Sequence, residues 1–212
     1  MGRFNVSNIL AAAAGAFALG IPIEPIREGI AALIHVPGRL EKVSAAGQPA
    51  VFVDYAHTDD ALRRVLQNLS LFRTGRIITV FGCGGDRDRG KRPLMGEAAS
   101  AYSDLTVVTS DNPRTEDPLS IIREIETGIR TTKFTDADDP ARRPAVRGYL
   151  VIPDRKTAIA TAIGLADTKD IVLIAGKGHE DYQIIGIEKF PFDDRLIARE
   201  ELTRRQVGRK EP

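Results

Sequence analysis

The chain has 212 residues, enough to bury a hydrophobic core in one large domain or in one domain with an appendage. Its hydrophobic content of 42% and charged content of 28% are those of an ordinary soluble globular protein. Its formal net charge of +1 excludes a strong overall electrostatic attraction to nucleic acid or to a membrane surface. The single cysteine, Cys83, excludes an intramolecular disulfide and fits a reducing cytosol. We therefore expect a cytoplasmic protein with no nucleic-acid or membrane partner.

Two helices are predicted at the start of the chain. The first covers residues 7–19, is rich in alanine, and has Ser7 or Asn8 available as its N-cap. Gly20 ends it, and the second helix covers residues 23–33. Glycines and a proline interrupt the apolar stretch here, so we interpret it as packed helix rather than as a signal peptide or a membrane span.

A domain boundary is predicted near residue 38. The first two helices have no strand to pack against, and residues 35–41 break the helical pattern. We therefore expect residues 1–37 to be the end of a preceding domain plus a linker, and residues 38–212 to form a domain of their own.

Strands and helices alternate after this boundary, which predicts an α/β domain with a Rossmann-like, mostly parallel sheet flanked by helices. The predicted strands cover residues 50–54, 76–81, 105–109, 149–152 and 170–175. The predicted helices cover residues 59–72, 118–130, 154–166 and 193–204, with a further helix that ends near residue 102. Residues 182–187 and 189–192 are expected to form a closing hairpin, and the polar residues 133–147 an exposed loop.

Three polar loops follow predicted strands, at residues 82–92, 110–114 and 176–180. Because the carboxyl ends of parallel strands meet at one edge of a sheet, we expect these loops to converge there. Their possible donors are Arg87, Arg89, Lys91, Arg92, Asn112, Arg114 and Lys177, and their possible acceptors are Asp86, Asp88, Asp111 and Glu180. Such a set suits a small ligand with both carboxylate and ammonium groups, such as an amino acid.

The segment 110–118 is the most informative of these loops. Pro113 fixes its own φ and biases Asn112 toward extended geometry, so the neighbouring polar side chains are held in place. The alternative interpretation is an ordinary Asp/Asn turn followed by a helix that starts at Asp117 and Pro118.

Residues 85–91 have the spacing of a phosphate-binding P-loop, but we do not expect them to be one. The motif requires Ser or Thr after its lysine, and this chain has Arg92. The alternative of an anion-binding site at the start of the following helix is left open. His57 and His179 could each contact a ligand or serve only the structure, and no spacing of His, Cys and carboxylates predicts a metal site.

Five segments of the chain carry a resemblance to a known family. They are Gly38-Arg-Leu-Glu, Asp54-Tyr-Ala-His, Phe81-Gly-Cys-Gly-Gly-Asp-Arg-Asp, Asp111-Asn-Pro-Arg and Gly176-Lys-Gly-His-Glu-Asp-Tyr-Gln. In this order they resemble the Mur ligases, specifically the diaminopimelate-adding (MurE) type, along essentially the whole chain. The resemblance implies a three-domain, ATP- and Mg²⁺-dependent amide ligase of peptidoglycan synthesis, of which this chain would be the carboxyl-terminal part.

The resemblance also implies roles for individual residues. Those implied to bind meso-diaminopimelate are Arg87, Asp111, Asn112, Pro113, Arg114, Gly176 and Glu180. Those implied to line the adenosine side of ATP are Asn8, Arg39 and Asp54. The family's P-loop and its magnesium-holding modified lysine belong to the central domain, so no catalytic residue is expected in this chain. Asp59 stands where the family usually has proline, and we expect the turn there to be altered.

The implied reaction transfers phosphate from ATP to the glutamate carboxylate of UDP-MurNAc-L-Ala-D-Glu, and the amine of diaminopimelate then attacks the acyl phosphate. This chain alone is expected to bind the amino acid and close over ATP without forming the amide bond. Two alternatives stay open: a related ligase that adds lysine or glutamate, and a stand-alone binding module without catalysis.

Overall fold

A computed structural model describes residues 3–33, 36–134 and 147–208 of the chain. Most of the polar loop predicted at 133–147 lies outside these described residues. The chain divides into two compact units, Met1–Val36 and Pro37–Pro212. The assignment of the first unit to a preceding domain stays a prediction.

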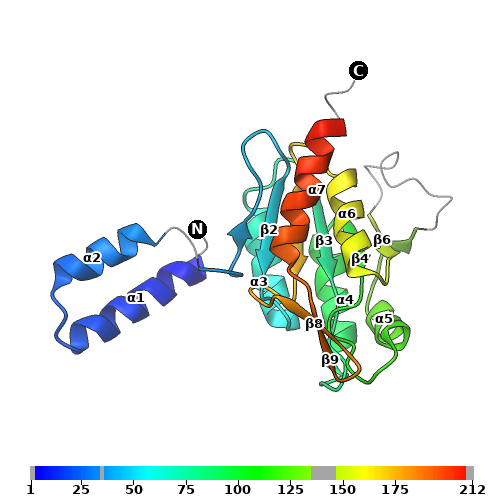
Figure 1. Cartoon of the computed structure of the whole chain (residues 1–212), viewed down its shortest axis with the longest axis horizontal. Helices are drawn as coiled ribbons and strands as arrows, with labels where there is room; N and C mark the ends of the chain where they lie inside the picture. Colours follow the sequence, from blue (N-terminus) through cyan, green and yellow to red (C-terminus); the bar gives the residue numbers. More distant parts are fainter. Residues whose placement is uncertain (1–2, 34–35, 135–146, 209–212) are drawn as a thin grey trace. The chain divides into compact units, whose positions relative to one another are not determined.

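The first unit contains two helices, α1 (Arg3–Ala18) and α2 (Ile23–Ala32) (Figure 1). The expected N-cap at Ser7 or Asn8 is wrong, because α1 begins four residues earlier than Ser7 and both residues lie inside it. Residues 3–6 contain neither glycine nor proline, so nothing stops the helix from extending. Gly20 has a φ of +81° and forms the turn after α1, as predicted.

The second unit is built on a seven-stranded sheet with the order β1-β2-β7-β3-β4-β6-β5. Its strands are β1 (Glu41–Lys42), β2 (Ala50–Asp54), β3 (Ile77–Phe81), β4 (Leu105–Val108), β5 (Thr132–Lys133), β6 (Gly148–Val151) and β7 (Ile171–Ala175). The pair β1–β2 is antiparallel and every other neighbouring pair is parallel. The predicted fold class is confirmed, and the sequence missed only the two-residue edge strands β1 and β5.

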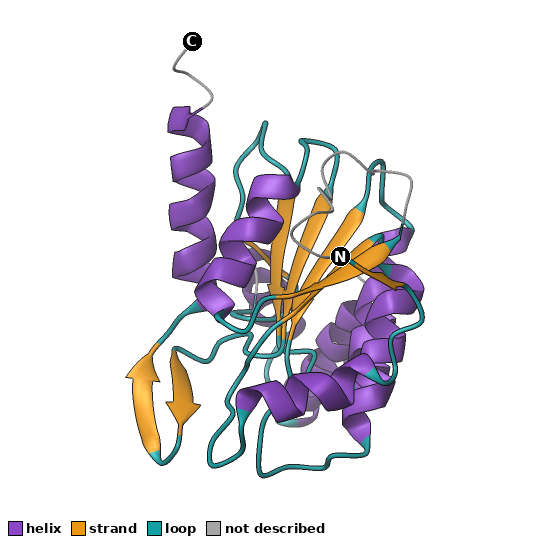
Figure 2. Ribbon diagram, turned by 90° about the vertical axis from the view of Figure 1, so that its right-hand side faces the viewer, coloured by secondary structure: helices purple, strands orange, loops and turns teal. Residues whose placement is uncertain are grey.

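Helices cover both faces of this sheet (Figure 2). They are α3 (Asp59–Ser70), α4 (Lys91–Tyr102), α5 (Pro118–Glu126), α6 (Arg155–Leu165) and α7 (Asp194–Gly208). A separate hairpin pairs β8 (Tyr182–Ile185) with β9 (Glu188–Pro191), as predicted. Helix α5 is shorter than expected, because the chain turns tightly at Gly128, where a Cβ would lie 1.8 Å from the carbonyl oxygen of Pro93.

The hydrophobic core forms two layers, one on each face of the sheet. Successive residues of a strand point to opposite faces: Phe81 of β3 packs toward α3, α4 and α5, whereas its neighbour Val80 packs toward α6 and α7. β3 and β7 are buried along their whole length. Their sequences are therefore near-continuous apolar runs, which is typical of a parallel sheet covered on both sides.

The first unit buries far less apolar surface than the second. Only Ile26 of α2 is a buried hydrophobic residue of the described part of this unit, whereas Leu10, Phe17 and Leu19 are 64–84% exposed. Backbone hydrogen bonds with so little apolar cover open readily.

We predict that hydrogen exchange will be faster for the amides of α1 than for those of β7. The reason is that local opening of α1 exposes little additional apolar surface, whereas opening of β7 disrupts both core layers. Exchange of the chain followed by mass spectrometry or NMR measures the difference. Equal protection of residues 8–18 and 171–175 would contradict it.

Candidate amino-acid site at the carboxyl edge of the sheet

The three polar loops predicted to converge do meet at one edge of the sheet. Neighbouring strands end in register, with Val80 of β3 beside Ile174 of β7 and Phe81 of β3 beside Val108 of β4. The loops then touch backbone to backbone. Gly85 N donates to Asn112 O over 2.9 Å, and a Cβ on Gly85 would lie 1.8 Å from the carbonyl oxygen of Pro113. Only glycine permits this approach.

Asn112 is buried and its side chain is held from three directions. Its Oδ1 accepts from Lys177 Nζ at 2.8 Å and from Ile184 N at 3.0 Å. Its Nδ2 donates to Glu180 Oε2 at 3.0 Å. Asn112 therefore joins the loop after β4 to the loop after β7 and to the hairpin strand β8.

Lys177 lies at the centre of this arrangement and is fully buried. Besides Asn112, its ammonium donates to Tyr182 O at 2.8 Å and forms an ion pair with Asp111 Oδ1 at 3.1 Å. Burial lowers the pKa of Lys177 below its ordinary value, against the opposing effect of Asp111. The expectation that Lys177 offers its ammonium to a ligand is not supported, because acceptors of the protein surround it.

A second buried cation, Arg155, stabilises the end of β7, directly before the loop of the site. Arg155 Nε and Nη2 lie 2.9 and 2.7 Å from the two carboxylate oxygens of Asp194, and Nη2 also donates to Ala175 O at 3.0 Å. Burial opposes the charge, but Asp194 raises the pKa of Arg155 above its ordinary value. The pair fixes the first residues of α6 and α7 against the end of β7, directly before Gly176.

Arg114 holds a backbone conformation that non-glycine residues rarely adopt, with a φ of +53°. Its N–H donates to Ile184 O at 3.1 Å and its carbonyl accepts from Gly186 N at 2.8 Å, so the hairpin fixes this backbone. Its Nη1 donates to Gly85 O at 2.7 Å. The guanidinium is half-buried beside the loop after β3, with further N–H groups left for a carboxylate.

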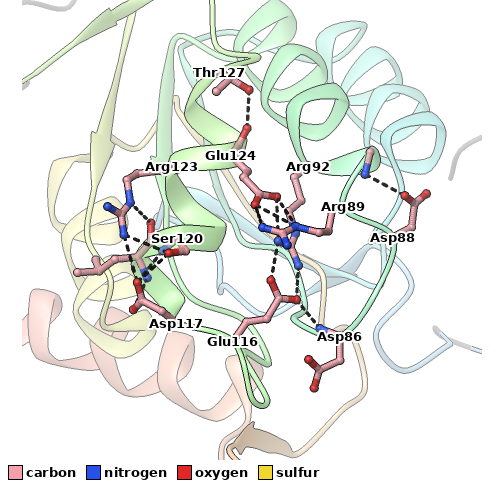
Figure 3. Close-up of polar contacts among 12 residues, drawn as sticks. Asp86, Asp88, Arg89, Arg92, Glu116, Asp117, Ser120, Arg123, Glu124 and Thr127 are labelled. Carbon is pink, nitrogen blue, oxygen red and sulfur yellow. Dashed lines mark hydrogen bonds and ion pairs between the residues drawn. The ribbon is translucent and has the colours of Figure 1, made fainter.

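The loop after β3 is braced by a buried arginine (Figure 3). Arg92 Nη1 lies 2.9 Å from both Glu116 Oε2 and Glu124 Oε2, and Nη2 lies 2.7 Å from Glu116 Oε1. Arg89 also pairs with Glu124. Two of the expected ligand donors, the exposed Arg89 and the buried Arg92, are thus paired with carboxylates of the protein. Arg87, by contrast, is exposed, and its Nη1 donates only to the adjacent Asp86 O among the hydrogen bonds of the described residues.

The segment 85–91 uses its backbone amides internally, as expected for a loop that is not a P-loop. Asp86 N donates to Glu116 Oε1 at 2.6 Å, and Gly90 N donates to Asp88 Oδ1 at 2.9 Å. Burial raises the pKa of the Cys83 thiol to about 12, which disfavours the nucleophilic thiolate. In the described parts of the chain, no three His, Cys, Asp or Glu residues cluster as a metal site would require.

A second group of polar residues lies where β2 ends. Asp54 is buried, and its carboxylate accepts from Leu40 N at 2.6 Å and from Ala56 N at 2.9 Å. Burial raises the pKa of Asp54 despite these hydrogen bonds. The guanidinium of Arg39 lies 5.0 Å from the centre of the Tyr55 ring, which is also 5.2 Å from the ring of His179. Gly38 and Gly178 allow this contact, because a Cβ on Gly38 would lie 2.2 Å from His179 N.

The remaining residue of the expected nucleotide set, Asn8, belongs to the first unit, inside α1. The turn expected to be altered at Asp59 is an ordinary helix start: Thr58 caps α3 by accepting from Ala61 N. An acidic residue at the first helical position favours the helix dipole, so Asp59 suits this helix start.

The opposite edge of the sheet carries a depression of about 600 Å³. It is lined by residues 73–76 and 167–170, around the ion pair between Arg76 and Asp170. Because the groups that line it are largely paired with each other and it lies beyond the amino ends of β3 and β7, we place the candidate site at the other edge.

The comparisons with known proteins assign the family. The sequence pattern of the family described as "Mur ligase, glutamate ligase domain" matches residues 38–178, which is more than half of the chain. The chain belongs to the Mur ligase family. This Mur ligase domain is 55% identical over 200 residues to the UDP-N-acetylmuramoyl-L-alanyl-D-glutamate--2,6-diaminopimelate ligase of Geobacter sulfurreducens, covering 93% of the chain. It is 54% identical over 197 residues to the ligase of the same name from Geobacter metallireducens, covering 92% of the chain.

Solved structures agree with the family assignment. A structure of a ligase with that name superposes with a TM-score of 0.71 and 39% identity over 97% of this chain. A pseudomurein peptide ligase type C from Methanothermus fervidus has a TM-score of 0.63 and 24% identity over 96% of the chain, which shows a shared fold. The chain spans 39% of the length of each of the two Geobacter relatives and of the first solved structure, and 36% of the second.

Sequence reasoning missed two features of this Mur ligase domain. It did not identify the Arg155–Asp194 pair, whose members are 39 residues apart. It also did not assign Glu116 and Glu124 to the cation Arg92. A hint was available for the second feature, because Arg92 stands at the start of one predicted helix and the two glutamates stand just before and within the next, where they can face each other when the helices pack side by side.

We predict that Glu116→Gln will destabilise the chain in a pH-dependent way. The hydrogen bonds from Arg92 lower the pKa of Glu116 from 4.5 to about 2. Because the pKa is lower in the folded state, the ionised carboxylate contributes stability that is complete above pH 4.5 and is lost as the pH falls through about 2. Urea unfolding at several pH values measures the difference between the variant and the unchanged chain.

The matched control is Glu97→Gln, which changes an exposed glutamate on α4. The difference for Glu116→Gln should shrink steadily below pH 4.5, while Glu97→Gln should have little effect at any pH. A destabilisation by Glu116→Gln that does not change with pH would contradict the ion-pair explanation.

Proposed function

We propose that this chain is the amino-acid-binding part of an ATP-dependent ligase that adds meso-diaminopimelate to UDP-MurNAc-L-Ala-D-Glu in peptidoglycan synthesis in the cytoplasm. The names of the relatives at 55% and 54% identity support this substrate. The observation that carries the proposal is that the loops of Arg114 and Glu180 meet at one sheet edge: Arg114 donates to Gly85 O, Gly85 N donates to Asn112 O, and Asn112 Nδ2 donates to Glu180. A cation and an anion at the same edge suit an amino acid with charges of both signs.

Each side chain has a defined share in binding. Glu180 is half-buried, and its carboxylate would accept from the substrate ammonium next to the backbone of Gly176. Arg114 would pair with the carboxylate at the far end of diaminopimelate, and the exposed Arg87 would reach a carboxylate from the neighbouring loop. Asp111 and Pro113 are buried and would shape the loop rather than touch the ligand.

The reaction requires an amine brought to an activated carboxylate. The amine nitrogen bonds to the carbonyl carbon of the acyl phosphate, the C–O bond to phosphate breaks, and the amine loses a proton. The chain's residues would hold this amine in position, which can contribute several orders of magnitude to the rate. Closure over the acyl phosphate would exclude water. The chain alone would bind the amino acid without forming the amide.

ATP would lie along the second group of residues. The rings of Tyr55 and His179 and the guanidinium of Arg39 form a surface on which an adenine can stack. Asp54 would act by fixing the backbone at Leu40 and Ala56. Mg²⁺ would be held mainly by phosphate oxygens and by residues outside this chain, since it commonly keeps few protein ligands.

We predict that Arg114→Ala in the full-length ligase will lower kcat/KM for meso-diaminopimelate by roughly 10²–10⁴ fold, the loss of one charge-assisted pair. Turnover with lysine should change far less, because lysine lacks the second carboxylate. Steady-state kinetics with both amino acids measure this. Arg64→Ala, which removes an exposed arginine from α3, is the matched control and should leave both substrates unaffected.

Equal losses with diaminopimelate and lysine would make Arg114 a structural residue and remove the main support for the proposed substrate. Efficient use of lysine by the unchanged ligase would favour the lysine-adding alternative directly.

A further inference from the structure

We propose that Lys177 is a positioning residue for amino-acid binding: its buried ammonium fixes which end of the Asn112 amide faces Glu180. The inference rests on the proposed function, because it assumes that Glu180 receives the substrate ammonium. It assigns a role to a lysine that we do not place among the ligand contacts.

The ammonium of Lys177 is committed to the protein. It has three N–H donors, and three acceptors from two segments, the loop after β4 and strand β8, lie within 3.1 Å: Asn112 Oδ1, Asp111 Oδ1 and Tyr182 O. The side chain has no exposed surface. A small-molecule ligand therefore has neither a free donor nor an open path to this ammonium, and any effect of Lys177 on binding must pass through its neighbours.

The neighbour that transmits the effect is Asn112. Two donors, Lys177 Nζ and Ile184 N, point at its Oδ1. If the amide turned over, its NH₂ group would face these two donors and its oxygen would face the Glu180 carboxylate. Both new contacts would be repulsive, and buried polar groups left without partners are costly. The cation thus forces the NH₂ group toward Glu180.

This orientation matters for Glu180 because a carboxylate that accepts a hydrogen bond on one oxygen keeps the other oxygen in a defined place. Asn112 Nδ2 holds Oε2 at 3.0 Å, and Glu180 N donates to Lys177 O at 2.9 Å, so the backbone around the carboxylate is fixed as well. The free oxygen can then meet a substrate ammonium without reorganisation, which is how preorganised groups gain affinity.

The test is Lys177→Met in the full-length ligase, with Lys156→Met as the matched control on the exposed surface of α6. We expect KM for meso-diaminopimelate to rise about 10–100 fold, the range for losing hydrogen bonds to a charged group, with KM for ATP unchanged. A merely structural defect would raise both constants or lower kcat alone. Circular dichroism checks folding, and Lys177→Gln, which keeps an N–H donor, serves as the second variant.

Coupling to Glu180 distinguishes positioning from general damage. In a Glu180→Gln background, Lys177→Met should have a much smaller effect on KM, because a glutamine can donate or accept and no longer requires one amide orientation. Additive effects of Lys177→Met and Glu180→Gln would overturn the inference. So would an unchanged KM for diaminopimelate, or loss of folding in both Lys177 variants, which would make Lys177 a folding determinant.

Arg114→Ala separates this inference from the proposed function. If Arg114→Ala discriminates diaminopimelate from lysine but Lys177→Met leaves KM unchanged, only the positioning role is wrong. If Arg114→Ala affects both amino acids equally, the proposed substrate fails whatever Lys177 does.

Discussion

The buried ammonium of Lys177 is the constraint on which the rest of the site depends. A lone charge removed from water costs far more free energy than the whole fold gains, so the protein must surround it with acceptors. Those acceptors come from the loop after β4 and from the hairpin strand β8. Satisfying this one cation brings together the segments that carry Asn112, Arg114 and Glu180.

A second buried charge, that of Arg155, stabilises the end of β7 next to the same site. Removing one partner of a buried ion pair leaves the other uncompensated, so Arg155 and Asp194 hold each other firmly even where the pair adds little net stability. Because Arg155 also donates to Ala175 O, α6 and α7 are fixed to the end of β7. The candidate site thus lies at the end of a fully buried strand that is held by α6 and α7.

The sequence predicted the sheet, its helices and the meeting of the three loops, because apolar runs and turn residues are local signals and parallel strands deliver their loops to one edge. It could not predict which cations face inward. Three possible donors follow glycine-containing segments and cannot be told apart by their position in the sequence: Lys177, Arg92 and Arg87. In the structure Lys177 and Arg92 are buried, whereas Arg87 is exposed. Their difference comes from partners distant in sequence, such as Asn112 and Glu116, and spacing along the chain does not encode those distances. The start of α1 was missed for a simpler reason, since a polar residue inside a helix resembles a cap.

The most direct test is a crystal structure of the full-length ligase with meso-diaminopimelate bound. We predict the amino acid at the carboxyl edge of the sheet, with one ammonium on the Glu180 carboxylate, the far carboxylate on the Arg114 guanidinium, and the Lys177–Asn112 contact intact. Diaminopimelate bound elsewhere, for instance at the opposite edge near Arg76 and Asp170, or bound with Arg114 turned away from both carboxylates, would contradict it.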